Sequence, residues 1–162
     1  MSAPPALHAA CLELAPLLGV WRGSGRGDYP TIEDFAYDEE LVFTHAGRPF
    51  VAMSQETTDA GTGEPRHAES GYLRPRSGGV VELVVCQPSG VVEVDVGSVL
   101  PTSDGIELEV TSSEIAPAPT AKSVTEVRRR LVVVGDTLVS ELWMAAAGEP
   151  LTHHLTAELH RS

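Results

Sequence analysis

The 162-residue sequence predicts an all-β fold: a ten-stranded antiparallel up-and-down β-barrel preceded by one short helix. Three observations predict it. Ten extended segments follow one another at short, even spacing, turn residues separate them, and helical spacing of apolar residues is confined to the N-terminus. A barrel is favoured over the alternative, a β-sandwich, because closure removes the edges of a ten-stranded sheet. A barrel of this size is too wide for side chains to fill and tends to hold a ligand.

The elements follow from local patterns. A helix is expected over residues 7–17, where Leu7, Cys11 and Leu14 recur at helical spacing and Pro16 lies near the end. Strands are expected over residues 19–27, 35–45, 49–58, 67–74, 80–87, 91–99, 106–115, 122–134, 137–147 and 151–160. Glycine-containing turns separate most of them. Residues 1–162 therefore form a single domain.

Composition excludes several function classes. The net charge of -12 argues against a nucleic-acid or anionic-membrane partner, since either needs a basic surface. The two cysteines, Cys11 and Cys86, lack the spacing of a zinc site. No signal peptide and no run of ~20 apolar residues is visible, so we expect a cytoplasmic protein. Its oligomeric state stays open, with a homodimer as one option.

The last two expected strands form a hairpin that carries adjacent histidines. If its loop is residues 148–150, Met144 lies directly opposite His154 on the same face. An imidazole beside a thioether suits a buried iron or a planar apolar cofactor. Strict alternation favours His153 instead, because the odd-numbered residues 151–159 form the apolar face. A histidine pair at such a position is also commonly structural, and the residues alone leave these alternatives open.

The first expected strand contains a GxWxGxG motif, made by Gly19, Trp21, Gly23 and Gly25, which all project to one face. Glycines there let another backbone or a flat ligand approach closely. The motif is not a dinucleotide fingerprint, because no helix follows it. A Gly-x-Trp on the first strand is general in lipocalin-like barrels, where the indole plugs one end, so the motif supports the fold more than a function.

Two further segments lie where they could reach a ligand. The turn Tyr29-Pro30-Thr31-Ile32 brings a hydroxyl and apolar groups to the barrel mouth, and His67 opens the fourth expected strand. Glu39-Glu40 is expected to be a solvated face. No nucleophile with an adjacent base is visible in the sequence.

The chain resembles the nitrobindin family over about residues 17–159. Five segments carry the resemblance: GVWRGSGRGDYPTIEDFAYDEELVF, RHAESGYLRPR, GVVEVDVG, APTAKSVTEVRR and MAAAGEPLTHHLTAEL. The resemblance implies a barrel that holds one haem b per subunit. It also implies that the ferric form binds nitric oxide and isomerises peroxynitrite to nitrate.

The same resemblance implies roles for individual residues. His154, which directly precedes a leucine, is implied as the axial iron ligand and hence as the catalytic position. Thr31 is implied as a haem contact, with Ile32 beside it, and His67 as a group on the distal side. We expect Met144 to line the proximal side. Some relatives have a methionine just before the distal histidine, where this sequence has an arginine.

A different function class stays open, namely a carrier of a fatty acid or another hydrophobic molecule without catalysis. Such carriers generally hold the ligand carboxylate with inward arginine and tyrosine side chains. Arg128, Arg129 and Arg130 could supply one. A purely structural role has no positive feature.

Overall fold

The computed structural model describes residues 4–162. A 3-10 helix, η1 (Ala9–Leu17), comes first, and a short 3-10 turn, η2 (Ser77–Gly79), lies between the fourth and fifth strands. The ten strands are β1 (Gly19–Tyr29), β2 (Ile32–Thr44), β3 (Val51–Asp59), β4 (Pro65–Pro75), β5 (Val80–Cys86), β6 (Val91–Pro101), β7 (Gly105–Pro117), β8 (Val124–Val134), β9 (Thr137–Ala146) and β10 (Thr152–Arg161). All ten expected strands are confirmed, with ends displaced by a few residues.

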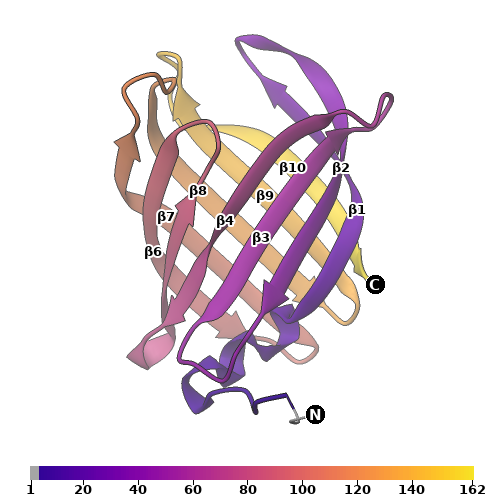
Figure 1. Ribbon diagram of the computed structural model, residues 1–162, viewed down its shortest axis with the longest axis vertical. Coiled ribbons are helices and arrows are strands. Elements are labelled where there is room, and N and C mark those ends of the chain that lie inside the picture. The colour runs from indigo at the N-terminus through magenta and orange to yellow at the C-terminus, as the bar shows by residue number, and fades with distance from the viewer. Residues whose placement is uncertain (1–3) are drawn as a thin grey trace.

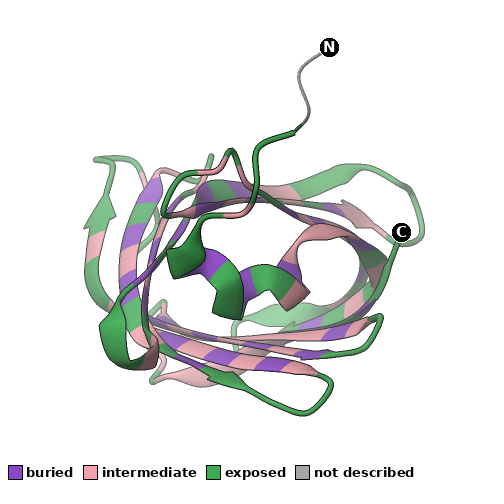
Figure 2. Ribbon diagram, turned by 90° about the horizontal axis from the view of Figure 1, so that it is seen from below, coloured by how far each residue is buried: buried purple, intermediate pink, exposed green. Residues whose placement is uncertain are grey.

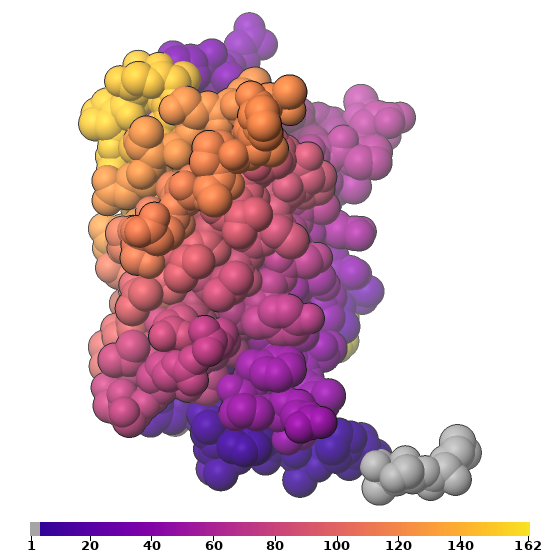
Figure 3. Space-filling model, turned by 60° about the vertical axis from the view of Figure 1, so that its left-hand side comes forward, coloured from indigo at the N-terminus to yellow at the C-terminus, as the bar shows by residue number. Residues whose placement is uncertain are grey.

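The strands close into a barrel in which each pairs antiparallel with its neighbours in sequence, and β1 pairs with β10 (Figure 1). Closure leaves no strand with an unpaired edge, which is the physical reason that favoured a barrel over a sandwich. Seen from outside, the barrel presents a continuous surface, with the indigo residues of the η1 region at its lower end (Figure 3). The predicted up-and-down barrel is therefore confirmed. No helix within residues 4–162 is long and apolar enough to cross a membrane.

The lower end of the barrel is closed by η1, which lies across the opening (Figure 2). Its apolar side chains Cys11, Leu14 and Leu17 are fully buried. Trp21 of β1 is also fully buried, and its indole Nε1 donates a hydrogen bond of 2.7 Å to the Leu17 carbonyl oxygen. The indole therefore plugs this end, as the motif predicts. The hydrogen bond satisfies the only polar atom of the indole, so Trp21 can lie buried with Cys11, Leu14 and Leu17 in the apolar core cluster.

The glycines of the motif permit close strand approach. A Cβ added to Gly23 would lie 2.0 Å from the Glu158 carbonyl oxygen on β10. One added to Gly25 would lie 2.4 Å from the Tyr37 ring on β2. Both distances are shorter than any real carbon contact, so side chains at these positions would push β1 away from its two neighbours. Gly23 and Gly25 therefore serve the close packing of β1 against its neighbouring strands.

Candidate functional site

The upper half of the barrel encloses a cavity of about 680 Å³. Its lining includes residues in or next to each connection at the end opposite η1, among them Ile32, Arg66, Ser89, Lys122 and Ala146. Leucines and valines from eight strands, together with a few polar side chains, form much of the remaining lining. A largely apolar chamber open at one end is the usual form of a small-molecule site.

The β9–β10 hairpin differs from the expected one. Met144 pairs with Thr152 and Trp143 with His153, but Leu142 pairs with Leu155. The prediction of a three-residue loop with Met144 directly opposite His154 is therefore wrong. His154 is the extra residue of a β-bulge, and it has no partner on β9.

The bulge also explains why strict alternation fails for the histidine pair. Below the bulge, Leu155, Ala157 and Leu159 point inward, as their pattern predicts. The bulge adds one residue without reversing the facing, so His154 and Leu155 both line the cavity. His153 lies on the outer face, where its ring contacts the Trp143 ring edge-on with 5.1 Å between centroids. The apolar-face argument for His153 is thus wrong, and the inward histidine is His154.

The imidazole of His154 is fixed by one hydrogen bond and two aromatic rings. Its Nδ1 lies 3.0 Å from the carbonyl oxygen of Asp28. A carbonyl oxygen can only accept, so Nδ1 carries the proton and Nε2 of the neutral ring keeps a free lone pair. The rings of Tyr29 and Phe35 stand edge-on to the imidazole at centroid distances of 5.2 and 6.1 Å. This is the arrangement that prepares a histidine to bind a metal through Nε2.

Tyr29 connects two strands at the mouth of the barrel, beside this histidine. Its hydroxyl accepts a hydrogen bond of 3.0 Å from the Ala146 backbone N–H and donates to the Met144 carbonyl oxygen, also at 3.0 Å. These bonds join β1 to β9, although β10 lies between the two strands in the barrel order. Tyr29 therefore joins β1 to β9 just above Gly27 and Leu155, where the pairing of β1 with β10 ends.

The other predicted site residues lie around the same mouth. Met144, His67 and Ile32 line the cavity, whereas Thr31 is exposed on the β1–β2 turn and is not among the lining residues. His67 comes from β4, four strands from β10 in one direction around the barrel and six in the other, so it faces His154 across the chamber. Its Nε2 lies 3.7 Å from Glu69 Oε2.

Arg66 occupies the position before His67. Its guanidinium lies over the Phe35 ring, 4.6 Å from the centroid, and its Nε donates to Asp59 Oδ2 at 3.1 Å. The arginine therefore packs against the same phenyl ring that contacts His154.

The residues around the cavity fit a haem group. One inward imidazole with an available Nε2 can supply a single axial bond, and Met144, Leu142 and Leu155 offer apolar surface beside it. Within residues 4–162, no three His, Cys, Asp or Glu side chains gather as metal ligands. Iron at His154 would accordingly need a porphyrin to supply its remaining ligands.

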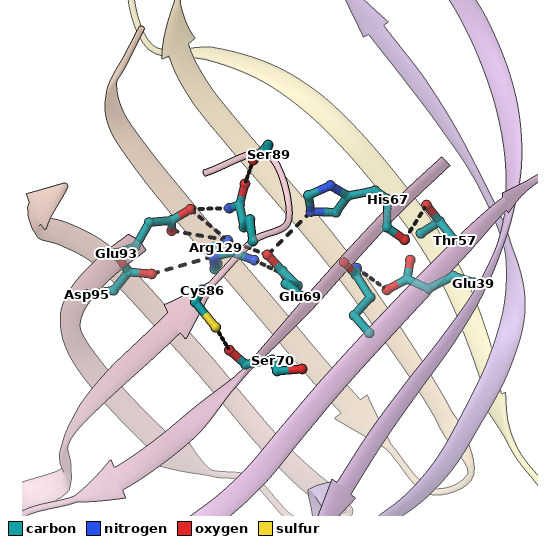
Figure 4. Close-up of polar contacts among 12 residues, drawn as sticks. Glu39, Thr57, His67, Glu69, Ser70, Cys86, Ser89, Glu93, Asp95 and Arg129 are labelled. Atoms are coloured by element: carbon teal, nitrogen blue, oxygen red, sulfur yellow. Dashed lines mark hydrogen bonds and ion pairs between the residues drawn. The ribbon is translucent and has the colours of Figure 1, made fainter. Parts of the chain in front are cut away.

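A buried charge cluster lies below the mouth, which the sequence reasoning missed (Figure 4). Arg129 of β8 contacts Glu69 of β4 through two hydrogen bonds, of 2.6 and 3.0 Å, and Glu93 of β6 at 3.1 Å. Its Nε lies 3.5 Å from Asp95 Oδ2. The four side chains are buried. We call Arg129, Glu69, Glu93 and Asp95 the interior charge cluster.

Burial and the arginine act in opposite directions on these carboxyl groups. Burial alone would raise the pKa of Glu69, but the charges and hydrogen bonds of Arg129 and His67 together outweigh it and hold that pKa at about 2. Burial dominates at Asp95 and raises its pKa to about 7, because the arginine is farther away and Glu93 lies close. Arg129 thus pairs more closely with Glu69 and Glu93 than with Asp95.

Glu39 lies next to this cluster and corrects another expectation. Glu40 is half-exposed and pairs with Arg22 on the outer face, as expected, but Glu39 points inward and is only 4 % exposed. Its Oε1 accepts a 2.7 Å hydrogen bond from Gln55 Nε2 on β3. Burial raises the pKa of Glu39 to about 7, although the Gln55 hydrogen bond acts to lower it. Both Glu39 and Gln55 line the cavity.

The three consecutive arginines divide between the two faces of β8. Arg128 and Arg130 pair on the outer face with Glu109 and Glu107, each at 3.0 Å or less. Only Arg129 points inward, and carboxylates of the protein already surround it. A carboxylate ligand would have to displace them.

Comparison with known proteins identifies the family. The family described as "THAP4-like, heme-binding beta-barrel domain" matches residues 10–161. The chain is 49% identical to "Peroxynitrite isomerase 2" of Mycobacterium ulcerans over 98% of both chains. It is 48% identical to "Peroxynitrite isomerase" of Nocardia farcinica, over 96% of this chain and 93% of that protein.

A solved structure agrees over the whole barrel. The crystal structure of Rv2717c from M. tuberculosis superposes with a TM-score of 0.94 at 47% sequence identity, covering 97% of this chain and 99% of that one. Fold and sequence similarity thus agree, and this chain belongs to the THAP4-like, haem-binding β-barrel family, the nitrobindins.

Proposed function

We propose that this chain binds haem b in the upper cavity, with His154 as the axial iron ligand, and that its ferric form isomerises peroxynitrite to nitrate and binds nitric oxide. The observation that carries the proposal is the His154 imidazole. It reaches the cavity through a bulge, and the Asp28 carbonyl leaves its Nε2 available. The names of the relatives, peroxynitrite isomerases at about half identity over nearly the full length, supply the reaction.

In this proposal the protein supplies ligation, orientation and a dry chamber. The Asp28 carbonyl fixes the ring tautomer, and the Tyr29 and Phe35 rings hold the imidazole plane. Met144 and Leu155 shield the proximal side from water. When bound, haem supplies the open coordination position and the one-electron chemistry needed at the peroxo bond. Thr31 is proposed as a contact at the cofactor's edge, and His67 faces the open side.

The reaction itself conserves atoms and charge, since peroxynitrite and nitrate are isomers. No protein group has to gain or lose a proton overall. We therefore propose that the protein contributes by holding the axial ligand and by shaping the distal chamber, and that His67 assists without being essential. Replacing it with alanine should slow isomerisation by only ~10-fold, below the usual contribution of a positioned proton-transfer group.

The test compares the two adjacent histidines. Haem titrated into the purified protein should give a Soret band at one haem per chain. His154→Ala should abolish that stoichiometric binding. The matched control, His153→Ala, should leave the band close to wild type because that ring lies on the outer face. The opposite pattern would refute the assignment. With haem bound, ferric protein should raise the nitrate yield from peroxynitrite, and cyanide should suppress the effect.

The second candidate, a carrier of fatty acids, has one observation in its favour and one against. Arg129 points inward, as such a carrier requires, but it is already paired with Glu69 and Glu93. A fatty-acid carboxylate there would add negative charge to a chamber that contains more acids than bases. Tight binding of a fluorescent fatty acid to the haem-free protein, and its displacement by an unlabelled fatty acid, would support the carrier function.

A further inference from the structure

The charges in the upper cavity present an electrostatic problem for the proposed reaction. The buried charged residues of the described chain are four acids, Glu39, Glu69, Glu93 and Asp95, and a single base, Arg129. Peroxynitrite is an anion near neutral pH. If all four acids were ionised, these five buried side chains would carry an excess of three negative charges. Arg66, Lys122 and Glu141 also line the cavity, and with them the sum is still two negative charges, which would disfavour an anionic substrate.

Glu39 is the acid best placed to change that balance. It lines the cavity on β2, whereas Asp95 is not among the lining residues and Glu69 and Glu93 are paired with Arg129. Gln55 occupies its Oε1. No hydrogen bond to Oε2 is found among residues 4–162, so this oxygen is available to the chamber.

We propose that Glu39 is a specificity-determining residue of the haem site: as a neutral carboxylic acid it removes one negative charge from the chamber and offers a hydrogen-bond donor, and so admits anionic ligands. The inference rests on the proposed function, because the anion is bound by haem iron. Protonated Glu39 keeps its proton while peroxynitrite is converted to nitrate, so no proton-transfer step is added to the isomerisation.

The groups around Glu39 support this state. Burial acts first and opposes ionisation, and the nearby Glu69 charge adds to it, while Gln55, Arg129 and His67 act in the opposite direction. Tyr37 on the same strand is buried, and its pKa is raised well above its ordinary value by burial and by Glu39. The net result is that the pKa of Glu39 lies at about 7. The chamber should therefore lose its affinity for anions as pH rises through neutrality.

The first experiment uses azide, a small anion, and nitric oxide, a neutral ligand, on the ferric haem-loaded protein between about pH 5.5 and 8.5. We expect azide to bind roughly 10-fold more weakly at the upper pH, equivalent to about one pKa unit of coupling. Nitric oxide affinity should stay nearly constant. Glu39→Gln should bind azide tightly across the range and abolish the pH step. Glu40→Gln, its outward neighbour, should behave as wild type.

Other titrating groups are separated by their own variants. The pH step should persist in His67→Gln and in Asp95→Asn. A step that disappears in either of these and persists in Glu39→Gln overturns the proposal. If Glu39→Gln does not fold, Gln55→Leu provides the second test. It removes a hydrogen bond that favours the ionised form, so the midpoint should move to higher pH. An unmoved or lowered midpoint contradicts the role of Glu39.

A measurement on the haem-free protein distinguishes failure of this inference from failure of the proposed function. Infrared difference spectra between wild type and Glu39→Gln should show a protonated carboxyl band at pH 6 that disappears by pH 8.5. If no Soret band forms in any variant, the haem proposal fails, whereas the infrared result still decides the protonation state. If haem binds and the carboxyl band is absent at pH 6, the inference about Glu39 is wrong.

Discussion

Replacing Arg129 with methionine should destabilise the barrel severely. The guanidinium makes four hydrogen bonds, of 2.6 to 3.1 Å, to Glu69 and Glu93. Those carboxylates are 5 % and 1 % exposed, so water cannot replace the lost partner. Removing one member of a buried ion pair typically costs about 3–5 kcal/mol, which is a large part of a domain's ~5–15 kcal/mol.

The pH dependence of that loss has a definite sign. In the wild type, the pKa of Glu69 is about 2, below its ordinary value, despite burial and because of Arg129. Its charge therefore stabilises the fold at neutral pH, and that contribution disappears as pH falls from about 4.5 towards 2. Without Arg129, burial raises the pKa of Glu69, so protonation relieves the variant as pH falls. The difference in unfolding free energy between the wild type and Arg129→Met should therefore be smaller at pH 5 than at pH 7.

Urea unfolding followed by tryptophan fluorescence measures this difference, since the buried Trp21 reports on the barrel end. Arg128→Met is the matched control. That arginine pairs with Glu109 on the outer face, where both side chains are over a third exposed, and should lose no more than ~1 kcal/mol. Equal losses for the two variants at pH 7 would refute the reasoning. The double variant Glu69→Gln/Arg129→Met should recover part of the loss.

Three smaller changes test the barrel wall and mouth. Gly23→Ala should prevent normal closure, because its Cβ would meet the Glu158 carbonyl at 2.0 Å; loss of cooperative thermal unfolding checks this, and native-like unfolding would contradict it. Tyr29→Phe should cost ~1–3 kcal/mol in urea unfolding by leaving the Ala146 N–H unpaired, and unchanged stability would contradict it. Met144→Leu, nearly equal in volume, should alter the haem absorption spectrum more than the melting temperature, and an unchanged spectrum would count against its proximal placement.

The architecture was predictable because each strand carries its own signal. Period-two alternation recurs along the strands and glycine-containing turns separate most of them, and both signals depend only on neighbours in sequence. Closure then followed from the number of strands. Even the plug role of Trp21 could be predicted, since a Gly-x-Trp at the start of the first strand is general to such barrels.

The interior charge cluster and the neighbouring Glu39 could be predicted only in part from the sequence. Glu39 alternates in phase with Tyr37 and Leu41, so its inward direction could have been read from that pattern. Arg129 likewise stands between the inward Val127 and Leu131. What sequence could not supply was the partners, because β2, β4, β6 and β8 converge only after the barrel closes. An inward acid on a single strand carries no indication of the base that it will meet.

The bulge at His154 is the feature that sequence patterns could not show, and it determines which histidine faces the cavity. With regular pairing continued upward from Leu155 and Leu142, His153 would point inward and His154 outward. One extra residue on β10 lets the leucine and the histidine before it face the cavity together. The pairing of β1 with β10 ends beside this bulge, at Gly27 and Leu155, and above that point the Tyr29 hydroxyl joins β1 to β9. Tyr29 and the Asp28 carbonyl are consecutive on β1, so one short segment both makes this connection and fixes the imidazole tautomer. Local irregularity of the wall and orientation of the proposed iron ligand are therefore parts of a single arrangement.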